Sequence, residues 1–228
     1  MVYAVIPAKN FYAAKQRLAT FLQPDERRLL AQAMLTDTLT ACSQAIGLQG
    51  IGVVTCDAQV AEMAVTLGAD VLWEPQADGQ SQAVTFAVQT CQQRGIMTIL
   101  TIPGDLPLLT AADVDAIIAP PQPPVPVVLV PNRDDLGTNA IVLSPPDCLP
   151  LRFGYDSFQR HLRLAAERHL AVEIRRLPRV ALDIDEPEDL ALFAAQHHSS
   201  HSLRMLADLG VLARLAQVPV PHTSEYGA

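Results

Sequence analysis

Apolar residues along this chain alternate between two spacings. Short runs rich in Val, Ile and Leu predict buried strands at residues 2–6, 51–55, 70–73, 97–102, 125–130, 140–143 and 171–174. Between most of these runs, apolar positions recur at helical spacing and predict helices at about 25–45, 57–67, 80–94, 111–118, 157–170 and 187–196. Because strands that alternate with helices are typical of an α/β fold, we expect three α/β/α layers around a mainly parallel sheet.

The helix at 25–45 has the clearest start. Pro24 precedes Asp25 and Glu26, and a proline followed by acidic residues in the first turn is typical of a helix N-terminus. The segment 120–124, in contrast, reads Pro-Pro-Gln-Pro-Pro, which cannot continue a helix or lie in the centre of a sheet. We expect this segment to be a stiff surface connector.

The chain divides into a large domain and a short extension. Its 228 residues are enough for one domain with a full hydrophobic core, which we place at 1–196. After Gln196 the sequence changes to a segment rich in His and Ser, a short amphipathic stretch at 203–215 and a polar end, so we interpret 197–228 as a C-terminal extension. His197, His198 and His201 could together bind a metal, but a solvated linker is the simpler interpretation.

Composition and charge exclude two classes of protein. Half of the residues are hydrophobic, yet no apolar run approaches the roughly 20 residues that a membrane-spanning helix needs. We therefore expect a cytoplasmic protein without a membrane partner. The formal net charge of -8 argues against a general nucleic-acid binder, because such proteins carry a basic surface that neutralises phosphates. Any phosphate site must then be local.

Several common nucleotide and metal motifs are missing. The chain has no Walker A sequence, and its G-x-x-G-x-G at 47–52 precedes a strand, whereas a dinucleotide fingerprint reads G-x-G-x-x-G and follows one. A P-loop enzyme and a dehydrogenase are therefore disfavoured. Cys42, Cys56, Cys91 and Cys148 form no C-x-x-C pair, so we expect buried reduced thiols rather than a zinc site or a redox motif.

Both lysines of the chain lie near its start. Lys9 and Lys15, with Arg17 beside them, follow the first predicted strand. In open α/β sheets ligands gather outside the carboxyl ends of the strands, so this loop is at the right edge to hold a phosphate chain. A solvated basic loop is the alternative, but the concentration of both lysines in one loop favours phosphate binding.

Acidic residues occur after the fourth predicted strand and near the last predicted helix. Asp105 follows Pro103 and Gly104, which fix the backbone and suit a carboxylate aimed at a divalent cation. Asp183 and Asp185 are two residues apart, so in an extended segment both carboxylates face one side and can share a hard cation such as Mg²⁺. Asp105 could instead be a turn aspartate, and Asp185 the N-cap of the following helix.

Polar motifs also lie between these acids, at residues 137–139 and 153–158. Ser157 follows Gly154 and looks like a helix N-cap, where free backbone N–H groups and the helix dipole attract an anion such as a carboxylate. Many helices begin with serine and bind nothing, so this motif alone is weak. His161 and His169 lie on a helix that we expect to pack, and we assign neither a chemical role.

Together these segments resemble the guanylyltransferase family of coenzyme F(420) biosynthesis over about residues 2–192. Five motifs occur in order: I-P-A-K-x-x-x-x-A-K-x-R-L-A, P-G-D-L-P-L-L-T, G-T-N-A, F-G-x-x-S-F-x-x-H and A-L-D-I-D-x-P-E-D-L. The resemblance implies a glycosyltransferase-A-like nucleotidyltransferase fold with GTP and Mg²⁺ at the sheet edge. It also implies that Asp105, Asp183 and Asp185 hold the metal.

The resemblance further implies that Thr138, Gly154 and Ser157 hold the carboxylate of an acceptor that receives GMP as pyrophosphate is released. The family's acceptors are 2-phospho-L-lactate, phosphoenolpyruvate and 3-phospho-D-glycerate, and the sequence does not choose among them. Gly79 is also among the expected substrate-binding residues. Where the family usually reads G-L-N, this chain reads Gly79-Gln80-Ser81, and this difference changes residues expected to contact the nucleoside. Leu136 replaces a usual small polar residue.

The chemistry needs positive charge more than a proton acceptor. An acceptor phosphate is already anionic at neutral pH, so attack on the α-phosphorus of GTP requires charge neutralisation and alignment. The expected catalytic residues are therefore Lys9, Lys15 and Arg17, which supply positive charge, together with Asp105, which the resemblance implies as a metal ligand. Two alternatives stay open: a related nucleotidyltransferase of the molybdopterin or sugar-nucleotide type, and a non-catalytic nucleotide-binding protein. The oligomeric state is also open, with a homodimer as one option.

Overall fold

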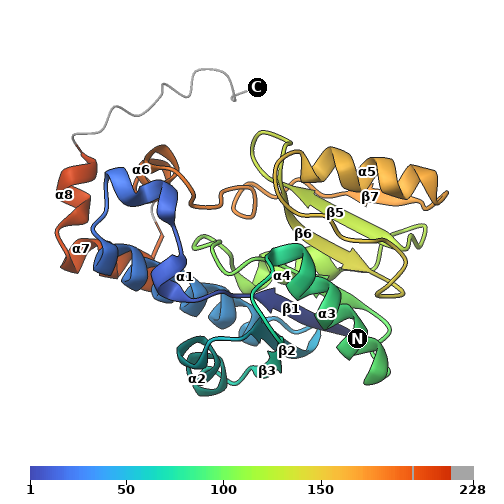
Figure 1. The fold of residues 1–228 in the computed structure, drawn as a ribbon. Coiled ribbons are helices and arrows are strands. Elements are labelled where there is room, and N and C mark those ends of the chain that lie inside the picture. Colours follow the sequence, from blue (N-terminus) through green and yellow to red (C-terminus); the bar gives the residue numbers. More distant parts are fainter. Residues whose placement is uncertain (197, 217–228) are drawn as a thin grey trace.

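A seven-stranded sheet in the order β3-β2-β1-β4-β6-β5-β7 forms the centre of the molecule (Figure 1). The computed structural model describes residues 1–196 and 198–216. Its strands are β1 Val2–Pro7, β2 Leu48–Thr55, β3 Asp70–Trp73, β4 Ile99–Thr101, β5 Val127–Pro131, β6 Thr138–Leu143 and β7 Val172–Ile174. β6 is antiparallel to β4 and β5, whereas the other neighbouring pairs are parallel. The predicted mainly parallel α/β sheet is confirmed.

The six predicted helices are present with small shifts of their ends. They are α1 Pro24–Gln44, α2 Ala58–Thr66, α3 Gln80–Gln93, α4 Ala111–Ile118, α5 Ser157–Glu167 and α6 Pro187–Ala194. The structure adds the short 3-10 helices η1 Phe11–Ala13 and η2 Gln16–Thr20, and near the C-terminus α7 His201–Asp208 and α8 Val211–Leu215. The proline-rich segment 120–124 connects α4 to β5 and is largely exposed, as expected.

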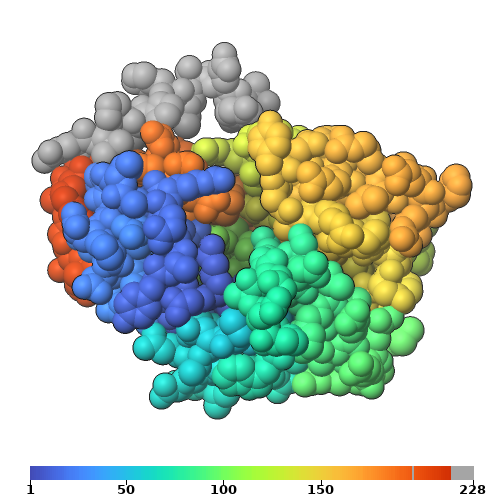
Figure 2. Space-filling view, in the orientation of Figure 1, coloured from blue at the N-terminus to red at the C-terminus, as the bar shows by residue number. Residues whose placement is uncertain are grey.

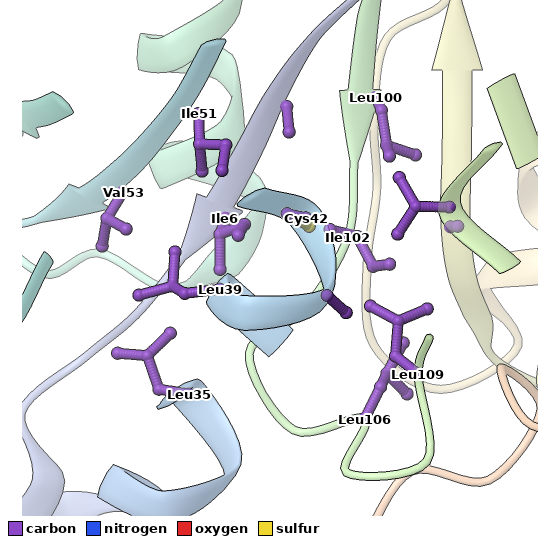
Figure 3. Close-up of a cluster of buried hydrophobic side chains, with 14 of the residues drawn as sticks. Ile6, Leu35, Leu39, Cys42, Ile51, Val53, Leu100, Ile102, Leu106 and Leu109 are labelled. Carbon is purple, nitrogen blue, oxygen red and sulfur yellow. The ribbon is translucent and has the colours of Figure 1, made fainter. Parts of the chain in front are cut away.

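Helices cover both faces of the sheet and so create three layers. On one face Ile6 of β1 packs with Leu35 and Leu39 of α1, and residues of α2 and α4 extend the same cluster (Figure 3). On the other face Tyr3 and Val5 pack with residues of α3 and α5. Successive strand residues point to opposite faces, which is why one apolar strand can supply both clusters.

The glycines at the start of β2 make room for an aromatic ring. A Cβ atom at Gly50 or Gly52 would lie 2.8 Å from the side chain of Tyr3 on the neighbouring strand. The Tyr3 hydroxyl donates a hydrogen bond of 2.7 Å to Asp70 at the start of β3. The glycine-rich segment before residue 51 therefore belongs to the strand, because its missing side chains let the sheet close around Tyr3.

The expectation of buried thiols is only half correct. All four cysteines are free, and Cys42 and Cys91 are buried in the two helix–sheet clusters. Cys56 is exposed, because it lies in the bend that follows β2, and Cys148 is half-buried. Burial raises the pKa of the Cys42 thiol to about 12, so this thiol stays protonated at neutral pH.

Residues 200–215 pack against the rest of the molecule. Leu206, Val211 and Leu215 are buried in a third cluster with residues of η2, α1 and α6. Asp37 of α1 accepts hydrogen bonds from the backbone of His201 and Ser202 and so caps α7. The division into a domain at 1–196 and an extension stays a proposal, and His197 and the polar end at 217–228 lie outside the described residues. Within residues 1–196 and 198–216, every helix is too short or too polar to span a lipid bilayer.

Candidate active site

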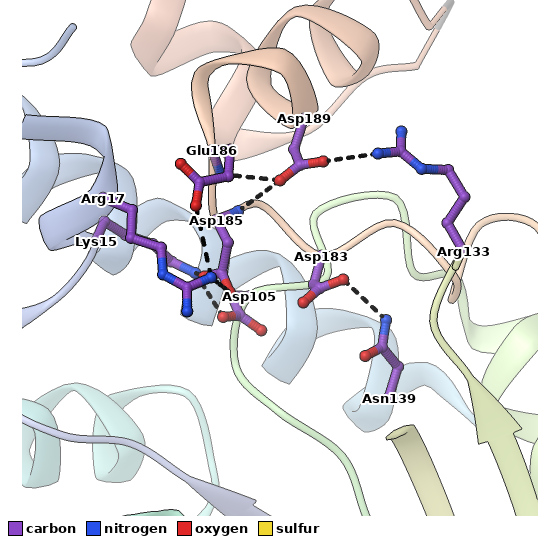
Figure 4. Close-up of polar contacts among 9 residues, drawn as sticks. All are labelled: Lys15, Arg17, Asp105, Arg133, Asn139, Asp183, Asp185, Glu186 and Asp189. Atoms are coloured by element: carbon purple, nitrogen blue, oxygen red, sulfur yellow. Dashed lines mark hydrogen bonds and ion pairs between the residues drawn. The ribbon is translucent and has the colours of Figure 1, made fainter. Parts of the chain in front are cut away.

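Three segments far apart in sequence meet at the edge where the parallel strands end. Lys15 lies between η1 and η2 with a left-handed backbone, and its Nζ donates to Asp105 Oδ2 at 2.5 Å and to Asp185 Oδ1 at 3.1 Å (Figure 4). In Figure 2 the blue N-terminal segment and the orange segment near residue 185 lie side by side beside a hollow in the surface. The structure thus brings Lys15, Asp105 and Asp185 together, as the sequence analysis expected.

The charge of Lys15 is held by its two partners. Burial alone would lower the pKa of this ammonium, but Asp105 and Asp185 outweigh burial, so the pKa of Lys15 is raised. Only 7% of the Lys15 side chain is exposed, compared with 28% for Asp105 and 44% for Asp185. Lys15 is therefore a buried positive charge whose carboxylate partners face the solvent side.

Arg17 lies at the outer rim of the same group. Its Nη1 atom is 3.7 Å from Asp185 Oδ2 and 3.6 Å from Glu186 Oε1, and most of the side chain is exposed. Exposed ion pairs of this length contribute little to stability, so the guanidinium is available to an incoming anion. Lys9 is exposed on the loop after β1, and in the described part of the chain no ion pair includes it.

Asp183 is a mostly buried carboxylate next to two others. Burial, together with the negative charges of Asp105 and Asp185, raises the pKa of Asp183 to about 6. The Asn139 amide Nδ2 donates to Asp183 Oδ1 at 3.3 Å. A buried carboxylate that faces two like charges favours a cation, and three carboxylates are the hard oxygen ligands that Mg²⁺ prefers.

These carboxylates are adjacent but do not form a ready-made metal cage. Across residues 1–196 and 198–216, no group of three or more His, Cys, Asp or Glu side chains is arranged to hold a metal. The Lys15 ammonium lies between Asp105 and Asp185 instead. The chemistry of the donor set fits a divalent cation, and the metal role of Asp105, Asp183 and Asp185 stays a prediction.

Asp185 is not the N-cap of α6. Glu186 occupies that position, and Asp189 accepts hydrogen bonds from the backbone N–H groups of Asp185 and Glu186. Arg133 lies between β5 and β6, and its Nη2 atom is 3.1 Å from the second carboxylate oxygen of Asp189. The Asp185 carboxylate is therefore left to Lys15 and Arg17, which removes the capping alternative.

A second polar group forms where β6 begins. The Thr138 N–H donates to Ser157 Oγ at 3.0 Å, and Thr138 Oγ1 lies 3.0 Å from His161 Nδ1. The Ser157 N–H donates to the carbonyl of Gly154, whose φ of 107° suits glycine. The three residues predicted to hold the acceptor are thus neighbours that Ser157 links together, and His161, to which we assigned no role, contacts Thr138.

The hydrogen bonds of His161 fix its tautomer. The Arg152 N–H donates to His161 Nε2 at 3.0 Å, so Nε2 carries no proton and Nδ1–H must donate to Thr138 Oγ1. Burial, with a smaller contribution from Arg160, lowers the pKa of His161 to about 4, so the ring is neutral at pH 7. The hydroxyl proton of Thr138 is then available to a further hydrogen-bond acceptor.

The prediction that Ser157 is an N-cap is wrong. Asp156 occupies the N-cap of α5 in a left-handed conformation with φ of 58°, and Ser157 is the first helical residue. Its hydroxyl accepts from the Thr138 N–H instead of from the helix's own backbone. Ser157 therefore ties α5 to β6, a role that the local sequence does not indicate because it depends on a distant strand.

Gly79 lies apart from both groups, at the start of α3. It is exposed, with φ of 91°, a left-handed conformation that disfavours other residues. A cavity of about 350 Å³ is lined by the nearby loop and one side of α3, namely Glu74, Pro75, Gln76, Asp78, Gln82, Thr85, Phe86 and Gln89. Two residues after Gly79, Ser81 Oγ accepts a hydrogen bond from the Phe153 N–H at 2.9 Å, which links this segment to the loop before α5.

Comparison with known proteins shows which family the chain resembles. The family model described as "Guanylyl transferase CofC like" matches residues 2–221. A phosphoenolpyruvate guanylyltransferase from Conexibacter woesei is 41% identical over 189 residues, 82% of this chain and 85% of the relative. A 3-phospho-D-glycerate guanylyltransferase from Colwellia psychrerythraea is 36% identical over 190 residues, 83% and 90% of the two chains.

The fold also matches solved structures. A putative nucleotide-diphospho-sugar transferase from Desulfovibrio desulfuricans G20 superposes with a TM-score of 0.77 at 19% identity, covering 96% of this chain and 99% of the other. This likeness supports the expected glycosyltransferase-A-like fold and, at such low identity, concerns the fold alone.

Proposed function

Since this chain belongs to the family of CofC-like guanylyl transferases, it is a nucleotidyltransferase, and we propose that it transfers GMP from GTP to phosphoenolpyruvate in coenzyme F(420) biosynthesis. The acceptor is taken from relatives such as those of Conexibacter woesei and Sphaerobacter thermophilus, named phosphoenolpyruvate guanylyltransferases at 41% and 38% identity. The observation that carries the proposal is the meeting of Lys15 with Asp105 and Asp185 beside Asp183 at the sheet edge.

The reaction joins two anions. A phosphate oxygen of the acceptor attacks the α-phosphorus of GTP, a new P–O bond forms, and the bond to the β-phosphate oxygen breaks with its electron pair leaving on pyrophosphate. The attacking oxygen is already anionic, so the protein has to align the two substrates and offset their negative charge. Lys15 and Arg17 carry that positive charge at the site, and Lys9, exposed on the loop after β1, would add to it.

Asp105, Asp183 and Asp185 would hold Mg²⁺. When bound, Mg²⁺ screens the phosphate oxygens and stabilises the charge that develops on the leaving pyrophosphate. The Lys15 ammonium exchanges one carboxylate for a phosphate oxygen when the nucleotide enters, since both partners are anionic oxygens.

The acceptor carboxylate binds at Thr138, Gly154 and Ser157. The free hydroxyl proton of Thr138 donates to the carboxylate, because His161 already occupies the Thr138 oxygen as a donor. Gly79 lies at the start of α3 and contacts the nucleoside, where only a residue without a side chain adopts its backbone conformation freely.

One experiment tests substrate and chemistry together. The purified protein is mixed with GTP, MgCl₂ and one of phosphoenolpyruvate, 3-phospho-D-glycerate or 2-phospho-L-lactate, and products are identified by mass spectrometry while pyrophosphate is assayed. We expect a GMP adduct and pyrophosphate with phosphoenolpyruvate, and little with ATP, CTP or UTP. Preferred turnover of 3-phospho-D-glycerate would transfer the proposal to that acceptor, and no pyrophosphate with any acceptor would refute it.

A further inference from the structure

Strand β6 contains a bulge at the point where it enters the site. Its pairing with β5 is regular from Val127 with Leu143 to Val130 with Ala140, and the next pair is Pro131 with Thr138. Asn139 is therefore an extra residue on β6 without its own partner on β5. Such bulges are common next to active sites, where they turn a side chain toward a new direction.

The bulge exchanges the faces of Thr138 and Asn139. In a regular strand Asn139 would share the face of Ile141, and Thr138 the face of Ala140. Instead, Thr138 contacts Ser157 and His161 of α5, on the face of Ile141. Asn139 Nδ2 donates at 2.9 Å to the carbonyl of Val180, whose side chain packs in the cluster that contains Ala140.

The side-chain amide of Asn139 donates two hydrogen bonds to the segment that contains Val180 and Asp183. Besides the Val180 carbonyl, Nδ2 donates to Asp183 Oδ1 at 3.3 Å, and the side chain is buried. In Figure 4 Asp183 lies between Asn139 and the carboxylates of Asp105 and Asp185. One oxygen of Asp183 is thus fixed by a neutral donor on the side away from the other acids, which directs the second oxygen toward them.

We infer that Asn139 is a positioning residue, whose amide holds Asp183 so that its free oxygen faces Asp105 and Asp185 and the divalent cation that the three would share. This inference rests on the proposed function, and it assigns the adjacent residues Thr138 and Asn139 to different ligands. Thr138 serves the acceptor and Asn139 the cation, although the two are neighbours in the chain. Partners that orient metal ligands typically change metal affinity by about 10–100-fold when they are removed.

The test separates cation binding from acceptor binding. Mn²⁺ affinity is measured by electron paramagnetic resonance in the presence of the α,β-methylene analogue of GTP, for the wild type, Asn139→Ala and Thr138→Val. We expect Asn139→Ala to bind Mn²⁺ about 10–100-fold more weakly, with the KM for phosphoenolpyruvate within about twofold of wild type. Thr138→Val should do the reverse, raising that KM while Mn²⁺ affinity stays within about twofold.

Several outcomes would overturn the inference. Unchanged Mn²⁺ affinity in Asn139→Ala, or parallel losses of Mn²⁺ and acceptor binding in both variants, would show that Asn139 does not position Asp183 specifically. If Asn139→Ala does not fold, Asn139→Ser, which retains one donor, is measured against the same expectations. If the wild type turns over GTP but the variants give one of these results, the inference alone is refuted. If the wild type shows no turnover, the proposed function is refuted.

Discussion

Arg179 holds Asp113 through two hydrogen bonds, from Nε to Oδ2 and from Nη2 to Oδ1, each 2.7 Å long. Asp113 also accepts from the backbone and hydroxyl of Thr110, closing the capping box of α4. Thr110 ends the segment that begins at Asp105, and Arg179 precedes Asp183 in the same loop. This fork therefore joins the two segments that carry the acidic residues of the site.

Replacing Arg179 should reduce how far the free energy of unfolding falls between pH 7 and pH 3. Burial alone would raise the pKa of Asp113, but the hydrogen bonds from Arg179 and Thr110 outweigh it and lower the pKa. A lowered pKa stabilises the fold above the ordinary aspartate pKa of about 4, and this stabilisation is lost as pH falls further. We expect Arg179→Met to cost about 1 kcal/mol at pH 7, since the guanidinium is half exposed, and less at pH 3.

Urea unfolding of both proteins at pH 7 and pH 3 measures this difference in the free energy of unfolding. Arg176→Met is a matched control, because Arg176 pairs with Asp135, which is far less buried than Asp113, and should show a smaller cost at pH 7. A cost for Arg179→Met that is the same at both pH values would contradict the role of Asp113.

Asp183→Asn should abolish turnover while the protein stays folded. The substitution keeps the shape of a mostly buried side chain and removes one of three carboxylates that repel one another, so thermal stability should not fall. Pyrophosphate release should drop by about 100-fold or more, since one charged ligand for the cation is lost. Glu188→Gln, in the same segment but exposed in the first turn of α6, provides the control and should keep its activity. Near-normal turnover of Asp183→Asn would exclude the metal role of this residue.

His161→Phe should weaken acceptor binding more than catalysis. The ring's donation to Thr138 is lost, and a net hydrogen-bond contribution of about 1 kcal/mol corresponds to roughly a five- to tenfold increase in KM for phosphoenolpyruvate. The KM for GTP should change little. His169→Asn is the control, because His169 is exposed and has φ of 56°, a conformation that Asn also adopts. An equal rise in both KM values would indicate general loosening of the fold.

The same histidine should make the wild type less stable in mild acid. Burial keeps the folded pKa of His161 at about 4, below the ordinary value of 6.5, so the unfolded chain binds a proton that the folded chain refuses. The free energy of unfolding should therefore fall by up to about 3 kcal/mol between pH 6.5 and pH 4, and this part of the fall should be absent in His161→Phe. Parallel stability profiles of the two proteins would contradict a neutral buried ring.

Leu206→Ala should show whether α7 belongs to the cooperative core. Leu206 is fully buried against residues of α1, η2 and α6, and removal of such a side chain typically costs about 2–5 kcal/mol. Leu209→Ala, one turn later and 39% exposed, should cost less than about 1 kcal/mol. Thermal melts of both variants provide the comparison, and equal melting temperatures would mean that the extension unfolds independently.

Local patterns predicted the elements of the fold well because each element obeys its own periodicity. The strand at 70–73 and the helix at 111–118 agree with β3 and α4 at both ends. Agreement is poorer where pairing decides the boundary. β4 is limited to Ile99–Thr101, the residues that pair with both β1 and β6, although the apolar run is longer.

The site was predictable in its residues but less so in its contacts. Lys15 and Asp105 were expected from the rule that ligands gather at the carboxyl ends of strands, and Asp183 and Asp185 from their spacing of two residues. The ion pairs of Lys15 and the link from Ser157 to Thr138 join residues far apart in the chain, so no local pattern reveals them. The bulge at Asn139 was not predicted for the same reason, because a bulge depends on how two strands pair and not on the sequence of one.

The reversed direction of β6 has a consequence for how such an enzyme could change its substrate. Because β6 runs against its neighbours, its first residue, Thr138, lies at the edge where the parallel strands finish. If the proposed function holds, the acceptor side would be shaped by the turn at 132–137 that leads into a strand, whereas the nucleotide side would be shaped by turns that lead out of strands. Lengthening or exchanging that one entry turn would then change the acceptor contacts while the residues proposed to hold the triphosphate stay in place.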